Sequence, residues 1–259
     1  MKKLLFLMVL IIGIIAVIGA CSKSDDSSTA ATATCAGMPV ATVSTCSDTA
    51  SGSITGLDNS SLSGVYDPYH AFGISGTAGV DNTTGCISAA SLVATLGGPT
   101  GTASVMTNMA VTSSSSMATR HKYFSDTSCT TELASISFVF TDVTVGDNVT
   151  GLSTTVTGKS STYPSTATKV TYKNTCDIIK GSTAAGVTYL DTLFGGALDL
   201  VVGTEYKCAV SGDTRYLLMK AWDTSALTVG TDGIWYYEDS TSAYPTDWTD
   251  DVNTWTKMP

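Results

Sequence analysis

The sequence predicts an all-β fold, namely an antiparallel barrel or curled sandwich with one or two short helices and several disulfide staples. The chain is rich in Thr, Ser, Val, Ala and Gly, and only 14% of its residues are charged. Long helical runs of Leu, Glu, Lys and Arg are missing, whereas many short segments alternate apolar and polar residues, as strands with one buried face do. Clusters of Gly, Asn, Asp and Pro separate these segments at fairly even intervals, which is typical of a sandwich or barrel.

Residues 1–20 have the composition of a secretory signal peptide. The basic Lys2 and Lys3 precede an apolar stretch over residues 4–18, and two small residues then lead to Cys21. A basic start, an apolar stretch and a small-residue cleavage site are the three parts of such a signal. The apolar stretch is shorter than the roughly 20 residues that a permanent membrane helix needs. The chain is therefore expected to be exported and cleaved.

The residues around the cleavage site indicate a lipid anchor. The tetrapeptide Ile-Gly-Ala-Cys at residues 18–21 resembles the bacterial lipobox, which implies cleavage before Cys21 and lipidation of that residue. Several acyl chains hold a protein firmly at a membrane, whereas one does so only marginally. Residues 21–34 are expected to be a flexible tether, because their Ser, Thr, Ala and Asp side chains cannot bury apolar surface. The alternative is an ordinary secretory signal followed by a chance cysteine.

The lipid on Cys21 makes a membrane the first expected partner and places the protein in a bacterial cell envelope. Ser22, rather than aspartate, follows the cysteine. By resemblance to Gram-negative sorting patterns, this residue favours the outer membrane, on its periplasmic face or at the cell surface.

Six further cysteines predict a disulfide framework, because an even number in an exported chain is typical of one. No two of them form a C-x-x-C pair, so a redox or zinc site is not expected. Many connectivities are possible for six cysteines, and short to moderate spacing favours the sequential one. The favoured pairs are Cys35–Cys46, Cys86–Cys129 and Cys176–Cys208.

Six stretches are expected to be strands because they alternate or are rich in apolar and aromatic residues. They span residues 105–111, 136–141, 169–173, 206–210, 215–220 and 234–237. The serine-rich residues 112–116 are expected to form a hairpin tip. Two segments have helix-compatible spacing: residues 87–96, with Gly97 as C-cap, and residues 190–200, which two glycines interrupt.

The length of the chain suits one large β domain. No long linker occurs after residue 50, so residues 61–259 are interpreted as the β domain. Residues 35–60 are interpreted as a small, disulfide-tied N-terminal extension.

Three short motifs in the β domain carry a family resemblance. Residues 62–66, Leu-Ser-Gly-Val-Tyr, match the pattern L-x-G-x-[WY], with Tyr66 where tryptophan is usual. Residues 123–129 contain a Tyr, an Asp and a Cys in the order of a Y-x-D-x-x-C segment. Residues 244–248 and 254–257 resemble an ending of the form R-P-T-x-L…Y-x-K, with Tyr244 where arginine is usual. Together they resemble the lipocalin-like β-barrels of the APCDD1 type and of related bacterial lipoproteins.

The resemblance implies a specific architecture and ligand class. An eight-stranded barrel of this kind has room for one small apolar ligand, and the aromatic residue of the opening motif, here Tyr66, plugs the barrel floor. The cysteine of the second motif, here Cys129, bridges back to a cysteine near the start of the barrel, here Cys86.

Composition and motif content argue against several functions. A formal net charge of −9 argues against nucleic acid, whose phosphates bind basic patches, and gives no reason to expect binding to anionic lipid headgroups. Neither His70 nor His121 lies in a nucleophile context, and no G-x-S-x-G occurs. His121 lies between Arg120 and Lys122 on an expected strand, which indicates an exposed position. No enzymatic activity, metal or cofactor is therefore expected.

Two functions remain for a lipid-anchored envelope protein. In the first, the barrel binds a small apolar ligand, and the candidate ligand-contacting residues are Tyr66, His70, Trp222 and Trp235. In the second, the protein is a structural or interaction lipoprotein, adhesin-like, with a filled barrel and no ligand, and its outer face meets an envelope protein or a glycan. A barrel interior solidly filled by large side chains would argue against the first function.

Overall fold

The computed structural model describes most of the chain from Cys46 onward. The described residues are 46–57, 60–68, 79–81, 84–155, 163–196, 198–210, 212–222, 233–248 and 253–258. The expected signal peptide, Cys21, the tether, Cys35 and His70 lie outside the described residues.

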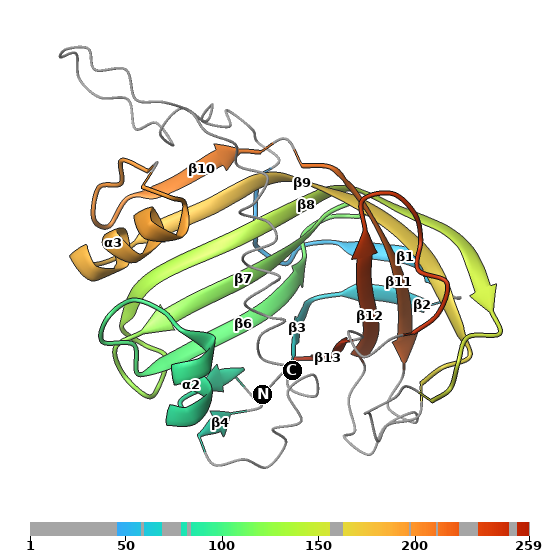
Figure 1. Ribbon diagram of the computed structural model, residues 1–259, viewed down its shortest axis with the longest axis horizontal. Helices are drawn as coiled ribbons and strands as arrows, with labels where there is room; N and C mark the ends of the chain where they lie inside the picture. The colour runs from blue at the N-terminus through green and yellow to red at the C-terminus, as the bar shows by residue number, and fades with distance from the viewer. Residues whose placement is uncertain are drawn as a thin grey trace.

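Eight antiparallel strands close into a ring, which confirms the predicted all-β barrel (Figure 1). These strands are β3 (Val65–Asp67), β6 (Ser104–Val111), β7 (Met117–Phe124), β8 (Glu132–Thr150), β9 (Thr166–Gly181), β11 (Thr214–Trp222), β12 (Gly233–Ser240) and β13 (Asn253–Lys257). In this order each strand pairs with the next one, and β13 pairs with β3 to complete the ring. Continuous pairing around the ring makes the fold an up-and-down barrel and not a curled sandwich.

Further short elements complete the fold at the two ends of the barrel. They are β1 (Ser53–Leu57), β2 (Ser60–Ser63), β4 (Val80–Asp81), β5 (Cys86–Ile87), β10 (Glu205–Ala209), α2 (Ala90–Leu96) and α3 (Ala184–Leu193). At one end β6 pairs with β5 instead of β3, and β9 pairs with β10 instead of β11. The ring is therefore open at this end, and both helices lie there (Figure 1).

Both ends of the barrel are closed by residues of the same chain. The β1–β2 hairpin contacts β6, β8 and β11, which belong to different sides of the ring. Its Ile54, Leu57 and Leu62 are buried in the interior core. At the other end, Val93 of α2 and Leu190 of α3 join the same core. One continuous apolar core therefore runs through the barrel from the hairpin to the helices.

The segment that begins at Cys46 packs on the outer face of the barrel wall. A disulfide joins Cys46 to Cys176 of β9, with 6.0 Å between their Cα atoms. Lys207 of β10 donates a hydrogen bond to the Cys46 carbonyl oxygen at 2.9 Å, and Ser137 of β8 donates one to the Asp48 carboxylate at 2.6 Å. These contacts bind the segment to three neighbouring strands.

This disulfide corrects two of the three predicted pairs. Because Cys46 bonds to Cys176, the predicted pairs Cys35–Cys46 and Cys176–Cys208 are wrong. Cys208 is also disulfide-bonded, with a partner outside the described residues. Sequence spacing failed here because the N-terminal segment folds back over a strand that lies 130 residues further along the chain.

The pair implied by the family resemblance, Cys86–Cys129, is confirmed, with 5.9 Å between the Cα atoms. Asp126 organises the turn that presents Cys129. Its carboxylate accepts hydrogen bonds from the backbone N–H groups of Ser128 at 2.8 Å and Thr130 at 3.2 Å. Cys129 itself has a φ of 54°. The conformation of this turn explains why an aspartate three residues before the cysteine belongs to the motif.

The two helices differ in extent from the predicted ones, while the six predicted strands and the hairpin tip at residues 112–116 are confirmed. Helix α2 begins at Ala90, because Ile87 pairs with Val80 in a strand. Helix α3 begins after Thr183, whose side chain accepts a hydrogen bond from the Gly186 N–H. None of the helices described is long and apolar enough to cross a membrane.

Candidate functional site

The barrel interior is the site that the sequence predicts for a ligand, and large side chains occupy it. These side chains share a position on the inner face of the ring or at its ends and are almost completely buried. The largest of them include Tyr66, Met117, Ile136, Tyr172, Ile179, Leu217, Met219 and Ile234. Aromatic contacts add to the packing, since the rings of Phe140 and Tyr172 lie 4.5 Å apart between centroids. Interiors packed in this way contain few voids larger than a water molecule.

Tyr66, the first candidate ligand residue, is part of this core. It lies on β3 opposite Met109 of β6 and Lys257 of β13, and only 2% of its surface is exposed. The backbone N–H of Ser63 donates a hydrogen bond of 3.3 Å to its hydroxyl oxygen. Tyr66 therefore fills the barrel where β3 closes the ring.

The two candidate tryptophans lie on other strands of the ring than Tyr66, where strand register makes them diagonal neighbours. His70 lies outside the described residues. Trp222 pairs with Gly233, and Trp235 pairs with Lys220, so the two tryptophans lie on neighbouring strands β11 and β12. Their backbone is described and their side chains are not.

Two tryptophans of the aromatic C-terminal part have separate structural positions. Trp255 of β13 belongs to the interior core. Trp248 is buried in a second cluster, which contains Leu152, Tyr163 and Leu218. Its indole N–H donates a 2.7 Å hydrogen bond to the Pro164 carbonyl oxygen. The aromatic residues of the C-terminal part therefore pack in two different clusters, the interior core and the second cluster around Trp248.

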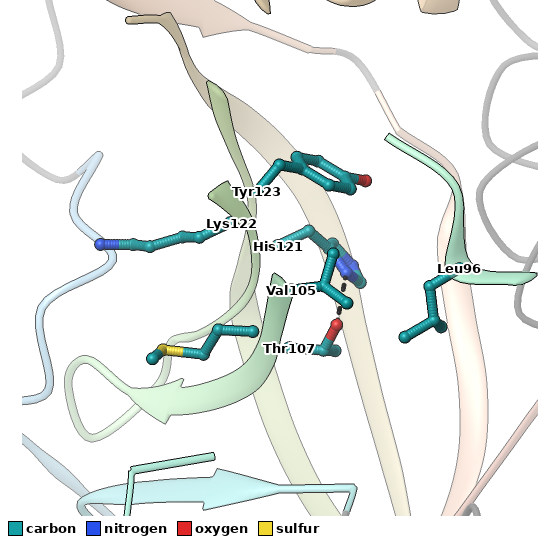
Figure 2. A pocket seen from close by; sticks show the side chains of 7 residues that line it. Leu96, Val105, Thr107, His121, Lys122 and Tyr123 are labelled. Carbon is teal, nitrogen blue, oxygen red and sulfur yellow. Dashed lines mark hydrogen bonds between the residues drawn. The ribbon is translucent and has the colours of Figure 1, made fainter. Parts of the chain in front are cut away.

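A small cavity remains beside His121, between β6, β7 and α2 (Figure 2). Its volume is about 10 Å³, and Leu96, Val105, Thr107 and Tyr123 contribute to its lining. A cavity must offer roughly 10–15 Å³ to hold one water molecule. This one has no space for an organic ligand.

His121 is buried, with 5% of its surface exposed, so the predicted exposed position is wrong. Its Nδ1 lies 3.1 Å from Thr107 Oγ1, and its ring meets Phe138 edge-on at 6.0 Å. Figure 2 shows Lys122 extending in another direction from His121, as the alternation of a strand requires. Burial lowers the pKa of His121 to about 4, so the ring is neutral at physiological pH.

Asp177 is a second polar group on the inner side of the wall, and the sequence analysis did not single it out. It is 2% exposed and lies opposite Phe138, a residue of the interior core. Burial raises its pKa to about 7, although a hydrogen bond from Asn174 acts in the opposite direction. The sequence did contain an indication that this residue is buried, because a single aspartate is followed by two isoleucines within an apolar strand.

Among the described residues, the interior polar groups do not bring a nucleophile, a base and an orienting group within hydrogen-bonding distance of one another. Thr107 and His121 are within hydrogen-bonding distance, but a nucleophile and base also need an orienting group and space for a substrate. No carboxylate in the described part of the chain hydrogen-bonds to His121, and the adjoining cavity holds at most one water. Within the described residues, no group of three His, Cys, Asp or Glu side chains could hold a metal ion.

Comparisons with known proteins leave the argument to the residues themselves. No protein-family model matches this chain, and no curated protein sequence matches it.

Proposed function

We propose that this protein is a non-enzymatic, lipid-anchored lipoprotein of the bacterial cell envelope. Its barrel is a rigid, self-filled scaffold whose outer face meets an envelope protein or a glycan. The observation that carries the proposal is the filled interior, in which one core extends from the β1–β2 hairpin through the ring to both helices.

The packing of the interior side chains favours this function over the binding of a small apolar ligand. Ligand pockets have volumes of roughly 300–1,000 Å³, while the interior cavity beside His121 has about 10 Å³. A ligand would have to displace side chains such as Tyr172 and Met219, which are buried completely or almost so. Removing core side chains from their packing costs several kcal/mol, on the order of 2–5 kcal/mol each.

Polar groups inside the wall also count against an apolar ligand. His121 and Asp177 each lose their contact with water on burial, and burial shifts the pKa of each toward its neutral form. The scaffold role requires only that these groups are packed, whereas a site for an apolar molecule would have no use for them.

Export and anchoring are supported by the sequence and by the disulfides. Structural disulfides persist in oxidising compartments such as the periplasm and the cell surface, and two are formed between described residues. The lipobox-like residues 18–21 supply the anchor. The up-and-down ring of eight strands supports the resemblance to lipocalin-like barrels, in a version whose interior is filled.

Native mass spectrometry tests the filled barrel. The mature chain with Cys21→Ser is exported to the periplasm, purified under oxidising conditions and measured before and after denaturation. We expect the bare mass with its disulfides intact and no additional component. A bound compound of a few hundred daltons, lost on denaturation, would instead support the ligand-binding function.

Radiolabelled palmitate tests the anchor independently. The full-length chain, expressed in a Gram-negative host, is expected to incorporate the label and to sediment with membranes. The Cys21→Ser variant is expected to lose both properties. Equal labelling of the two proteins would contradict lipidation at Cys21.

A further inference from the structure

A pocket of about 380 Å³ lies on the outer wall of the barrel. It is bounded by the hairpin tip between β6 and β7, by the middle of β8 and β9, and by the Cys46–Cys176 disulfide. Its volume falls within the range of roughly 300–1,000 Å³ that is usual for small-molecule sites. The outer wall therefore has room for a ligand that the interior cavity beside His121 lacks.

The lining of this pocket combines an apolar part with a ring of hydroxyl groups. Val139 and the Cys46–Cys176 disulfide are buried and supply the apolar part. The polar part consists of five hydroxyl side chains and one carboxylate, namely Ser113, Ser115, Ser116, Thr141, Thr175 and Asp142.

These hydroxyl groups are held in place and still have hydrogen-bonding capacity. The Oγ atoms of Ser113 and Ser116 lie 2.6 Å apart, and the Oγ1 atoms of Thr141 and Thr175 lie 3.0 Å apart. Each hydroxyl can donate one hydrogen bond and accept two. The mutual contacts therefore orient the groups and leave further acceptor positions for a ligand.

Asp142 reaches the pocket through a distortion of β8. The register between β8 and β9 shifts between Thr141 and Thr144, and Asp142 adopts a φ of 54°. This left-handed conformation is uncommon for residues other than glycine, and strand bulges of this kind often re-aim a side chain beside a functional site. The Asp142 side chain is exposed, and within the described residues its carboxylate has no hydrogen-bond or ion-pair partner.

The charge and the hydroxyl groups of the lining favour one class of ligand over two others. An anion would meet the Asp142 charge, and among the described residues no lysine, arginine or histidine lines the pocket to offset it. An apolar molecule would remove water from the carboxylate and the hydroxyls without replacing the lost hydrogen bonds, which is costly. A neutral sugar satisfies these groups with its own hydroxyls and brings no charge that Asp142 would repel.

We infer that this outer-wall pocket binds a neutral hexopyranose unit of a glycan. The Asp142 carboxylate accepts hydrogen bonds from two adjacent sugar hydroxyls, and the serine and threonine hydroxyls bind the remaining ones. This inference rests on the proposed function, in which the outer face of the barrel meets a partner. It deepens that function by identifying the chemistry of the partner.

Saturation-transfer NMR tests this inference on the mature chain with Cys21→Ser, which retains every residue of the fold described. The probes are the methyl glycosides of glucose, galactose, mannose and N-acetylglucosamine, with glucuronate as an anionic counterpart of glucose. We expect at least one neutral glycoside to bind and glucuronate to bind more weakly.

Variants then assign the signal to the pocket. Asp142→Asn tolerates the left-handed backbone and loses the charge, and it is expected to weaken binding about tenfold, as the loss of a hydrogen bond to a charged group does. Ser115→Trp, at an exposed position of the rim, is expected to block the pocket. Asp147→Asn removes the same charge from an exposed position further along β8 and is expected to bind as the parent chain does.

The inference is overturned if no neutral glycoside binds, or if Asp142→Asn and Ser115→Trp bind as well as Asp147→Asn. Circular dichroism and the mass of the oxidised protein show that each variant is folded. A negative result here leaves the filled scaffold untouched, because native mass spectrometry tests that proposal separately.

Discussion

The side-chain nitrogen of Asn174 donates a 3.0 Å hydrogen bond to Oδ1 of Asp177 in the wall of the barrel. The Oδ1 atom of Asn174 is buried and has no hydrogen-bond partner in the described part of the chain. A protonated Asp177 carries a donor as well as acceptors, whereas an ionised one is an acceptor only. Burial favours the neutral acid and outweighs the Asn174 hydrogen bond, which favours the ionised form, so the pKa of Asp177 is raised to about 7.

Asp177→Asn should therefore change the pH dependence of stability. The pKa of Asp177 is raised on folding, so its contribution to the unfolding free energy is fully present below pH 3.8 and is lost as the pH rises through 7. Asparagine keeps the acceptor for Asn174 and cannot ionise. Its stability advantage over the parent chain is expected to grow by about 3 kcal/mol between pH 5 and pH 8, at about 1.4 kcal/mol per pKa unit.

Urea unfolding at a series of pH values measures this difference. Asp191→Asn, the same substitution at a position on helix α3, serves as the matched control. Parallel stability curves for the parent chain and Asp177→Asn would show that Asp177 does not titrate between these pH values.

His121→Asn should produce the opposite change. The pKa of His121 is lowered to about 4 on folding, so its contribution is present above pH 6.5 and is lost as the pH falls through 4. Asparagine retains a polar atom near the position of Nδ1, within reach of Thr107. The stability of the variant relative to the parent chain is expected to rise by about 2 kcal/mol between pH 8 and pH 5.

The two groups act in opposite directions over the same range of pH. Asp177 stabilises the fold as the solution becomes more acidic, and His121 destabilises it. The parent chain should therefore have a flatter stability curve than either single variant. If His121→Asn and the parent chain lose stability equally toward acidic pH, the buried histidine is not the cause of that loss.

The two described disulfides should contribute unequally to stability. Cys46–Cys176 closes a sequence separation of 130 residues, and Cys86–Cys129 closes one of 43. In the chain-entropy account a longer loop gives a larger effect, so removing the first bond by double serine substitution should cost about 5 kcal/mol, and removing the second about 1 kcal/mol less. Thermal unfolding of both variants checks the order, and peptide mapping of the oxidised parent chain checks the pairing. A larger loss for the shorter loop would show that local packing outweighs chain entropy.

The strand pattern was predictable because period-two alternation survives locally in β6 and β11. The same rule could have placed His121 correctly, since its charged neighbours Arg120 and Lys122 must occupy the opposite face of β7. Arg120 is itself covered, because it donates to Asn108 and to the Asp48 carbonyl oxygen of the N-terminal segment. The charged neighbours of His121 suggested an exposed position, but the N-terminal segment covers this part of the barrel wall.

Other features depended on irregularities that the pattern does not encode. A register shift between β8 and β9 places Asn174 opposite Phe140 but Cys176 opposite Val139, so simple alternation fails across Thr175. The outer-wall pocket depends on a further shift, the one beside Asp142. The Cys46–Cys176 bond depends on the path of the N-terminal segment. Each of these is a tertiary property, and no spacing within one strand reveals it.

Gly186→Ala provides a test of how α3 closes the barrel. In an exposed helix the change would stabilise by about 1 kcal/mol, because alanine is the better helix former. At this position a Cβ atom would lie 2.0 Å from the carbonyl oxygen of Leu133 and would force helix and strand apart. We expect a loss of about 1–3 kcal/mol, the usual cost of overpacking, measured by urea unfolding. Thr188→Ala, on the exposed side of the same helix, should change stability by no more than about 0.5 kcal/mol. If Gly186→Ala were as stable as this control, α3 would not pack directly against β8, and the closure of the barrel at this end would be wrong.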